Sequence, residues 1–161
     1  MGERWNKIAF FVRSSLVDAR PAYYTNVFQP SLYARRIQIL LVEDDEPDAY
    51  LIRRALAGNP RVREVILAEN GVEALQLIDR GEVSPDLAIV DLHMPRKNGF
   101  ELMHDFAIRD GARFPSVVLT SSASGADALR AAHCGAVEFV TKPDTVEKLA
   151  VALDRAIFNA V

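Results

Sequence analysis

Short apolar runs of strand length recur along the chain, and charged side chains follow three of them, directly or after one residue. The runs lie at 37–42, 87–90 and 137–140. The charged residues that follow them are Glu43, Asp44, Asp45, Asp91 and Lys142. If the runs form neighbouring parallel strands, their ends meet at one sheet edge, where open α/β sheets bind ligands. Several carboxylates and one ammonium at a single spot indicate a metal ion and an anion between them.

Strand-like and helix-like segments alternate from residue 37 onward. The strand-like runs are apolar without alternation, as in strands buried on both faces. We predict strands near 37–42, 64–68, 86–90, 116–120 and 136–140, and helices near 47–57, 71–80, 99–109, 125–133 and 145–159. Five strand–helix units with short connections predict an α/β fold with a doubly wound parallel sheet. The pattern alone does not predict the strand order.

Helix start signals support these assignments. Pro47 suits a first helical turn. Three pairs have the spacing of a capping box, namely Asn70 with Glu73, Asn98 with Glu101, and Asp144 with Glu147.

The charge of the chain divides it into two parts. Residues 1–36 carry a net charge of +4, whereas residues 37–161 carry −7. The acidic part argues against nonspecific binding of nucleic acid by that part. We interpret 1–36 as a basic N-terminal extension and 37–161 as the domain. The extension is either a loosely ordered leader or over-extended start, or a short helix that binds a partner or a membrane surface.

The composition also restricts the compartment. No apolar run approaches the roughly 20 residues that span a bilayer. A single cysteine, Cys134, excludes an internal disulfide and fits a reducing compartment, so we expect a cytoplasmic protein.

Two interpretations of the first acid run remain open from the residues alone. Glu43, Asp44 and Asp45 could cap the following helix, whose N-terminus favours negative charge. They could instead bind Mg²⁺, which prefers oxygen ligands and removes the repulsion between carboxylates. Asp91 favours the second interpretation, because a carboxylate beside a metal can attack phosphorus. Lys142 would add positive charge there.

A transition-metal site is the weaker alternative. The candidate ligands are His93, His104, His133 and Cys134. Apart from the adjacent His133 and Cys134, no two of them have convincing ligand spacing on one element.

Four motifs, in order, resemble those of the receiver domain of two-component response regulators. They are 39–45 (ILLVEDD), 91–99 (DLHMPRKNG), 119–121 (LTS) and 135–143 (GAVEFVTKP). Residues 42–56 are similar to stand-alone receivers of the cyanobacterial phytochrome regulator type. The resemblance covers about 37–159 and implies a flavodoxin-like sheet of order 2-1-3-4-5 with five helices.

The resemblance also implies roles for individual residues. Asp91 would accept the phosphoryl group. Asp44 would bind Mg²⁺ directly and Glu43 mostly through water, with Asp91 and the backbone carbonyl of His93 as further ligands.

Three further positions have implied roles. Thr120 and Lys142 would hold phosphoryl oxygens. Phe139 occupies the position of the family's switch aromatic, and Thr120 and Phe139 together would form the conformational switch. The Lys142–Pro143 peptide would be cis.

The implied function is phosphoryl transfer from a sensor histidine kinase or a phosphotransfer protein onto Asp91. The protein would catalyse only its own phosphorylation and dephosphorylation. Since the sequence ends just after the last helix, we expect the signal to leave through the receiver surface. A downstream protein, or a second copy, would bind the face made by the fourth helix, fifth strand and fifth helix.

Two other functions compete with this one. A phosphohydrolase with an aspartyl-phosphate intermediate would need a second acid two residues after the nucleophile, and that position is His93. A pseudo-receiver that signals by binding alone would lack the acids or the lysine, and all are present.

Overall fold

The computed structural model describes residues 35–109 and 114–161. The basic extension therefore lies outside the described residues, except for Arg35 and Arg36. Arg35 pairs with Asp86 at 2.7 Å, and the Arg36 guanidinium donates a 2.9 Å hydrogen bond to the Val62 carbonyl. These two residues attach the start of the domain to the sheet.

Within the described residues, five strands and five helices alternate, as the pattern predicts. The strands are β1 (Ile37–Val42), β2 (Val62–Ala68), β3 (Leu87–Val90), β4 (Ser116–Thr120) and β5 (Ala136–Thr141). The helices are α1 (Glu46–Leu56), α2 (Gly71–Asp79), α3 (Gly99–Ile108), α4 (Gly125–His133) and α5 (Val146–Ala160). All strand pairs are parallel, and the order is β2-β1-β3-β4-β5. The order implied by the resemblance is confirmed.

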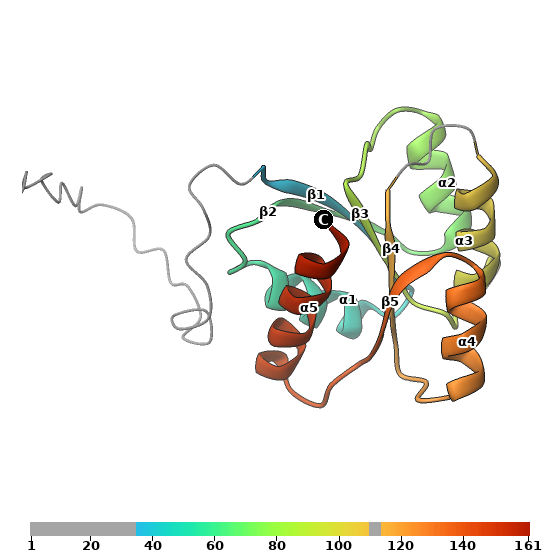
Figure 1. Ribbon diagram of the computed structural model, residues 1–161. Coiled ribbons are helices and arrows are strands. Elements are labelled where there is room, and N and C mark those ends of the chain that lie inside the picture. The colour runs from blue at the N-terminus through green and yellow to red at the C-terminus, as the bar shows by residue number, and fades with distance from the viewer. Residues whose placement is uncertain (1–34, 110–113) are drawn as a thin grey trace, which may run out of the picture.

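The helices cover both faces of the sheet. Helices α1 and α5 lie on one face, and α2, α3 and α4 lie on the other (Figure 1). Every residue of β1, β3 and β4 is buried, which explains why these strands are apolar without alternation. The edge strand β2 has two exposed residues and three half-buried ones.

Two of the three predicted capping pairs need correction. Asn98 and Glu101 form the complete reciprocal box. Asn70 caps α2, but the Glu73 carboxylate accepts from the backbone of Glu69 instead of Asn70.

The last helix begins one residue later than predicted. Thr145 has the extended backbone of an N-cap, and its hydroxyl accepts from the Lys148 backbone. The Asp144 carboxylate instead pairs with the Lys148 ammonium at 2.8 Å. The prediction of Asp144 as the cap was therefore wrong.

Among the described residues, every helix is too short or too polar to cross a bilayer.

Candidate functional site

Strand register brings the predicted charged residues to one edge of the sheet. Val42, the last residue of β1, pairs with Val90, the last residue of β3. The residues that follow them, Glu43 and Asp91, therefore emerge side by side. On the other side of β3, the Lys142 amide donates a 2.8 Å hydrogen bond to the Thr120 carbonyl. Thr120 and Lys142 thus leave the sheet together.

Three carboxylates meet at this edge. One oxygen from each of Glu43, Asp44 and Asp91 lies within 4.8 Å of the other two. Glu43 and Asp91 are buried, with 2% and 7% of their surface exposed, whereas Asp44 faces solvent. Oxygen donors in a partly open cluster fit a hard divalent cation that keeps some of its water.

Asp45 has the other role that the sequence left open. Its carboxylate accepts from the Asp48 backbone N–H at 2.9 Å and caps α1. The acid run therefore divides between a helix cap and the carboxylate cluster.

Lys142 supplies the only ammonium that the described residues bring to the cluster. Its Nζ lies 2.8 Å from Glu43 Oε2, 2.7 Å from Asp48 Oδ2 and 3.6 Å from Asp91 Oδ1. Asp48 is not among the site residues predicted from the sequence. The only sequence signal for a role of Asp48 was its place among the acids in the first turn of α1. Acids in a first turn are equally typical of helices without a functional site.

Burial and pairing shift two pKa values here. Burial raises the pKa of Glu43 to about 7, and the nearby Asp91 charge adds to this, although Lys142 opposes it. Burial alone would lower the pKa of Lys142, but its hydrogen bonds to Asp48 and Glu43 outweigh that effect and raise it. Lys142 is therefore a fixed positive charge beside Asp91.

The backbone around Asp91 is tightly packed. The His93 amide donates to Asp91 Oδ2 at 2.9 Å, and the Gly99 amide donates to the Leu92 carbonyl at 3.1 Å. A Cβ on Gly99 would lie 2.2 Å from the Asp91 carbonyl oxygen, which no side chain tolerates. Glycine at this position lets the first turn of α3 close over the loop that carries Asp91.

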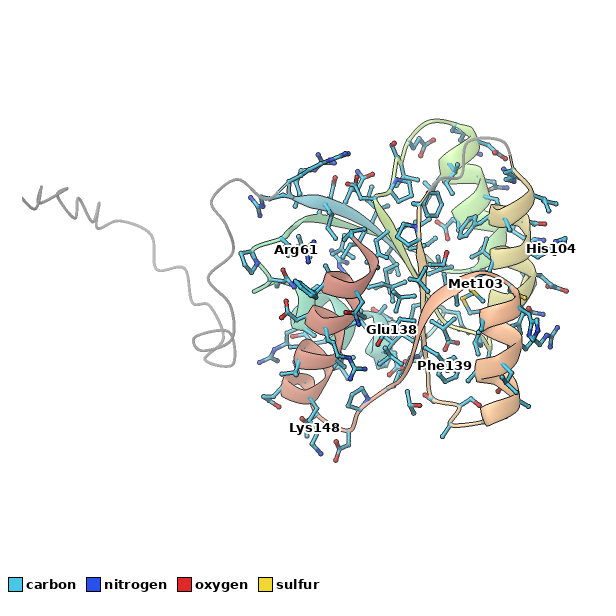
Figure 2. All side chains as sticks on the ribbon, in the orientation of Figure 1. Arg61, Met103, His104, Glu138, Phe139 and Lys148 are labelled. Atoms are coloured by element: carbon cyan, nitrogen blue, oxygen red, sulfur yellow. The ribbon has the colours of Figure 1, made fainter. Side chains whose placement is uncertain are left out.

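The remaining predicted residues lie nearby or in the adjoining core. Thr120 is buried at the end of β4, and its hydroxyl accepts from the Ser122 amide at 3.3 Å. Phe139 is half-buried on β5, on the side of the sheet that faces α4, and packs against a cluster that includes Met103 (Figure 2). The His93 side chain is exposed.

One expectation about the backbone was wrong. No peptide bond within 35–109 or 114–161 is cis, so the Lys142–Pro143 bond is trans. The trans form is the default for a bond before proline, with a preference of about 0.5–1 kcal/mol.

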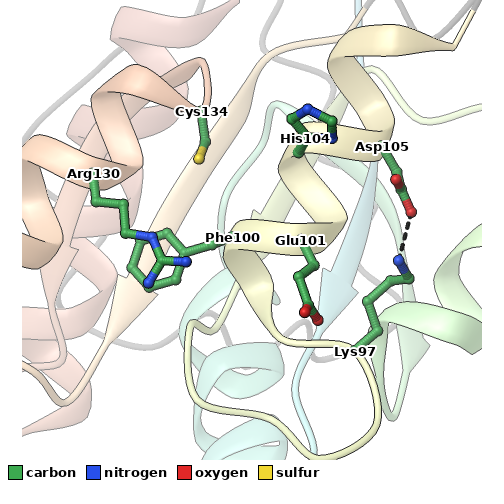
Figure 3. A pocket seen from close by; sticks show the side chains of 7 residues that line it. All are labelled: Lys97, Phe100, Glu101, His104, Asp105, Arg130 and Cys134. Carbon is green, nitrogen blue, oxygen red and sulfur yellow. Dashed lines mark hydrogen bonds and ion pairs between the residues drawn. The ribbon is translucent and has the colours of Figure 1, made fainter.

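The histidines and the cysteine do not form a metal site. Among the described residues, the acids are the only group of three or more candidate ligands close enough to share an ion. His104 and Cys134 line a separate hollow of about 360 Å³ between α3 and α4 (Figure 3). Arg130 closes one side of it, stacked 4.0 Å above the Phe100 ring.

Comparison with known proteins assigns the family. The model of the response regulator receiver domain matches residues 39–154. The chain belongs to the response regulator receiver family. This receiver is 34% identical over 113 residues to the response regulator MprA of Mycobacterium sp. (strain KMS), covering 70% of the chain and 47% of that relative.

A second relative is longer still. The receiver is 30% identical over 122 residues to the sensor histidine kinase CheAY of Helicobacter pylori, covering 74% of the chain and 15% of the relative. The chain therefore spans less than half the length of either relative.

Solved structures include the regulator type that the motifs resemble. The phosphorylated cyanobacterial phytochrome response regulator RcpA superposes with a TM-score of 0.69 at 28% identity, covering 74% of this chain and 90% of that one. The Mn²⁺-bound form of the response regulator Rcp1 gives 0.66 at 25% identity, with the same coverage. The resemblance to the phytochrome regulator type is confirmed.

Proposed function

We propose that this receiver accepts a phosphoryl group onto Asp91 from a sensor histidine kinase or a phosphotransfer protein, in a Mg²⁺-dependent reaction in the cytoplasm. The supporting observation is the convergence of Asp91, two further carboxylates and the Lys142 ammonium at one sheet edge. Both an acid-rich cation site and a fixed positive charge favour transfer of an anionic group.

Asp91 is the nucleophile in this proposal. One of its carboxylate oxygens forms a bond to phosphorus while the bond from phosphorus to the donor histidine nitrogen breaks. The electron pair of that bond stays on the leaving imidazole. The His93 amide holds Asp91 Oδ2, so the carboxylate enters the reaction already oriented.

The other residues neutralise or bind the incoming charge. Asp44 and Asp91 would hold Mg²⁺ directly, together with the His93 carbonyl, and Glu43 mostly through water. The cation supplies charge neutralisation when bound. Lys142 and the Thr120 hydroxyl would hold phosphoryl oxygens. Thr120 ends β4, the neighbour of β3, and Lys142 follows β5, which lies on the other side of β4.

A groove beside Glu43 and Asp44 offers a docking surface for a donor protein. It has a volume of about 800 Å³ and runs from the acids along α1 and the end of β2. Its lining includes Tyr50, Arg53 and Arg54 of α1 and Leu67 of β2. A donor protein seated in this groove would contact Glu43 and Asp44, the two acids that lie beside Asp91.

The signal leaves through the surface made by α4, β5 and α5. Phe139 packs beneath α4, and Leu129 and Val137 are exposed on this face. A downstream protein or a second copy of the chain would bind there. The acidic domain gives no support for binding of nucleic acid.

Labelling with a small phosphoryl donor tests the proposal. Acetyl phosphate and Mg²⁺ should add one phosphoryl group by intact mass, and Asp91→Asn should abolish the addition. Asp86→Asn is the matched control, because Asp86 directly precedes β3, whereas Asp91 directly follows it. Equal labelling of Asp91→Asn, or none of the wild type, would overturn the assignment. Turnover of small phosphate esters would instead favour a hydrolase.

A further inference from the structure

Lys142 is engaged less closely by Asp91 than by two other carboxylates. Its ammonium contacts Asp48 at 2.7 Å and Glu43 at 2.8 Å, whereas Asp91 lies at 3.6 Å. An ammonium has three donors, and two of them are directed at these closer oxygens. In the unphosphorylated state the lysine is therefore occupied by partners other than the phosphoacceptor.

Asp48 is held in place to make this contact. It lies in the first turn of α1, and its backbone amide donates to the capping carboxylate of Asp45 at 2.9 Å. Its side chain reaches from α1 to the residue that follows β5, across 94 positions of sequence. The pair therefore links the first helix to the far side of the site.

The two partners of Lys142 differ in how easily they can release it. The Glu43 side chain is 2% exposed, so without the lysine or a cation it would be a buried unpaired charge. The Asp48 side chain is 34% exposed and can be hydrated as soon as the ammonium leaves. Asp48 is consequently the partner that Lys142 can exchange at little cost.

We propose that Asp48 is the resting counterion of Lys142 and competes with the phosphoryl group for its ammonium. This inference rests on the proposed function of Asp91 and Lys142. When Asp91 is phosphorylated, Lys142 turns from the Asp48 carboxylate to a phosphoryl oxygen, and Asp48 becomes hydrated. Asp48 is a positioning residue that weakens the phosphorylated state and makes the first turn of α1 sensitive to it.

Beryllofluoride, a mimic of the phosphoryl group on aspartate, measures this competition. Its affinity is titrated at saturating Mg²⁺, so that differences in cation affinity do not contribute. Asp48→Asn keeps the shape of the side chain and removes its charge. Glu46→Gln is the matched control, because Glu46 is an acid of the same helical turn but makes no ion pair with any residue that the structure describes. Asp48→Glu tests rescue by a carboxylate.

We expect Asp48→Asn to bind beryllofluoride roughly two- to fivefold more tightly than the wild type, as the loss of a partly exposed ion pair predicts. Glu46→Gln should match the wild type, and Asp48→Glu should return most of the way to it. In the wild type, the carboxyl ¹³C resonance of Asp48 should shift when beryllofluoride binds, because its partner leaves.

The outcomes separate this inference from the proposed function. If the wild type binds beryllofluoride but Asp48→Asn binds equally or more weakly, the role of Asp48 is overturned and that of Asp91 stands. An unmoved Asp48 resonance in the bound wild type overturns it as well. If the wild type does not bind beryllofluoride, or Asp91→Asn binds it, both proposals fall.

Discussion

At the scale of single residues, Glu43 is an acid whose surroundings disfavour its charged form. Its carboxyl is almost fully buried beside Asp91, and its pKa is raised from an ordinary 4.5 to about 7. The folded protein therefore holds a proton that the unfolded chain releases above about pH 4.5. In metal-free protein, the contribution of Glu43 to the free energy of unfolding should fall as pH rises from 4.5 to 7, and then level off.

Mg²⁺ binding should show the opposite trend. A cation favours the Glu43 carboxylate, so the affinity for Mg²⁺ should rise as pH increases through about 7. Calorimetric titrations from pH 5.5 to 8.5 measure the effect. In Glu43→Gln the affinity should be lower and should lose this pH dependence. A wild-type affinity that is constant across the range would contradict the role of Glu43.

Gly99 is the residue whose replacement should damage the site without removing a functional group. An alanine Cβ would collide with the Asp91 carbonyl, so Gly99→Ala should move the Asp91 loop. We expect a loss of about 1–3 kcal/mol in the free energy of unfolding, the usual cost of overpacking, together with slower phosphorylation.

Gly125 provides the control for that substitution. It is the first residue of α4, as Gly99 is of α3, but its added Cβ would meet no atom within 4 Å. Gly125→Ala should be neutral or stabilising in urea unfolding, because alanine favours a helix. Equal stability of the two variants would show that the contact between Gly99 and Asp91 is not limiting.

At the scale of elements, β4 and β5 connect the site to the surface of α4. Thr120 ends β4 beside the site, and Phe139 on β5 pairs in register with Val118 and packs in the cluster under α4. If the Thr120 hydroxyl moves toward a phosphoryl group, it leaves space that Phe139 can enter. This would bias a pre-existing equilibrium in the face of α4, β5 and α5.

NMR with and without beryllofluoride tests this coupling. Amide resonances of Phe139 and of residues 125–133 should shift along with those around Asp91. In Thr120→Ala, the shifts near Asp91 should remain while the distant ones diminish. Wild-type shifts confined to the Asp91 pocket would rule out the coupling.

The sequence predicted the elements well because each depends on local information. Apolar runs and capping residues place every strand and helix within about two residues of its observed bounds. The errors arise where two neighbouring residues can both cap a helix. At α5, Thr145 is the N-cap, and Asp144 pairs with Lys148 instead. Strand order depends on contacts distant in sequence, and it came from the family resemblance instead of the pattern.

The site was predictable in its acids and its lysine but not in their contacts. Residues that directly follow buried parallel strands must meet at one edge, which is why Glu43, Asp91 and Lys142 were found. Asp48 comes from a helix, and its contact with Lys142 depends on how α1 packs against the sheet. No sequence spacing encodes that distance.

At the scale of the whole molecule, the described residues contain a complete sheet with helices on both faces. Every proposed site residue lies after residue 36. We therefore expect a protein lacking residues 1–34 to keep Arg35 and Arg36, unfold cooperatively, bind Mg²⁺ and be phosphorylated as fast as the full chain. Loss of a cooperative thermal transition in the truncated protein would show that the basic extension stabilises the domain.

The central claim is that Asp91, and no other acid at this edge, carries the phosphoryl group. Borohydride reduces an aspartyl phosphate to homoserine, so peptide mass spectrometry after reduction identifies the residue. In wild-type protein treated with acetyl phosphate and Mg²⁺, we predict homoserine at position 91 alone, with none when Mg²⁺ is chelated. Homoserine at position 44 or 48, or none at position 91 in protein that has gained a phosphoryl group, would contradict the account.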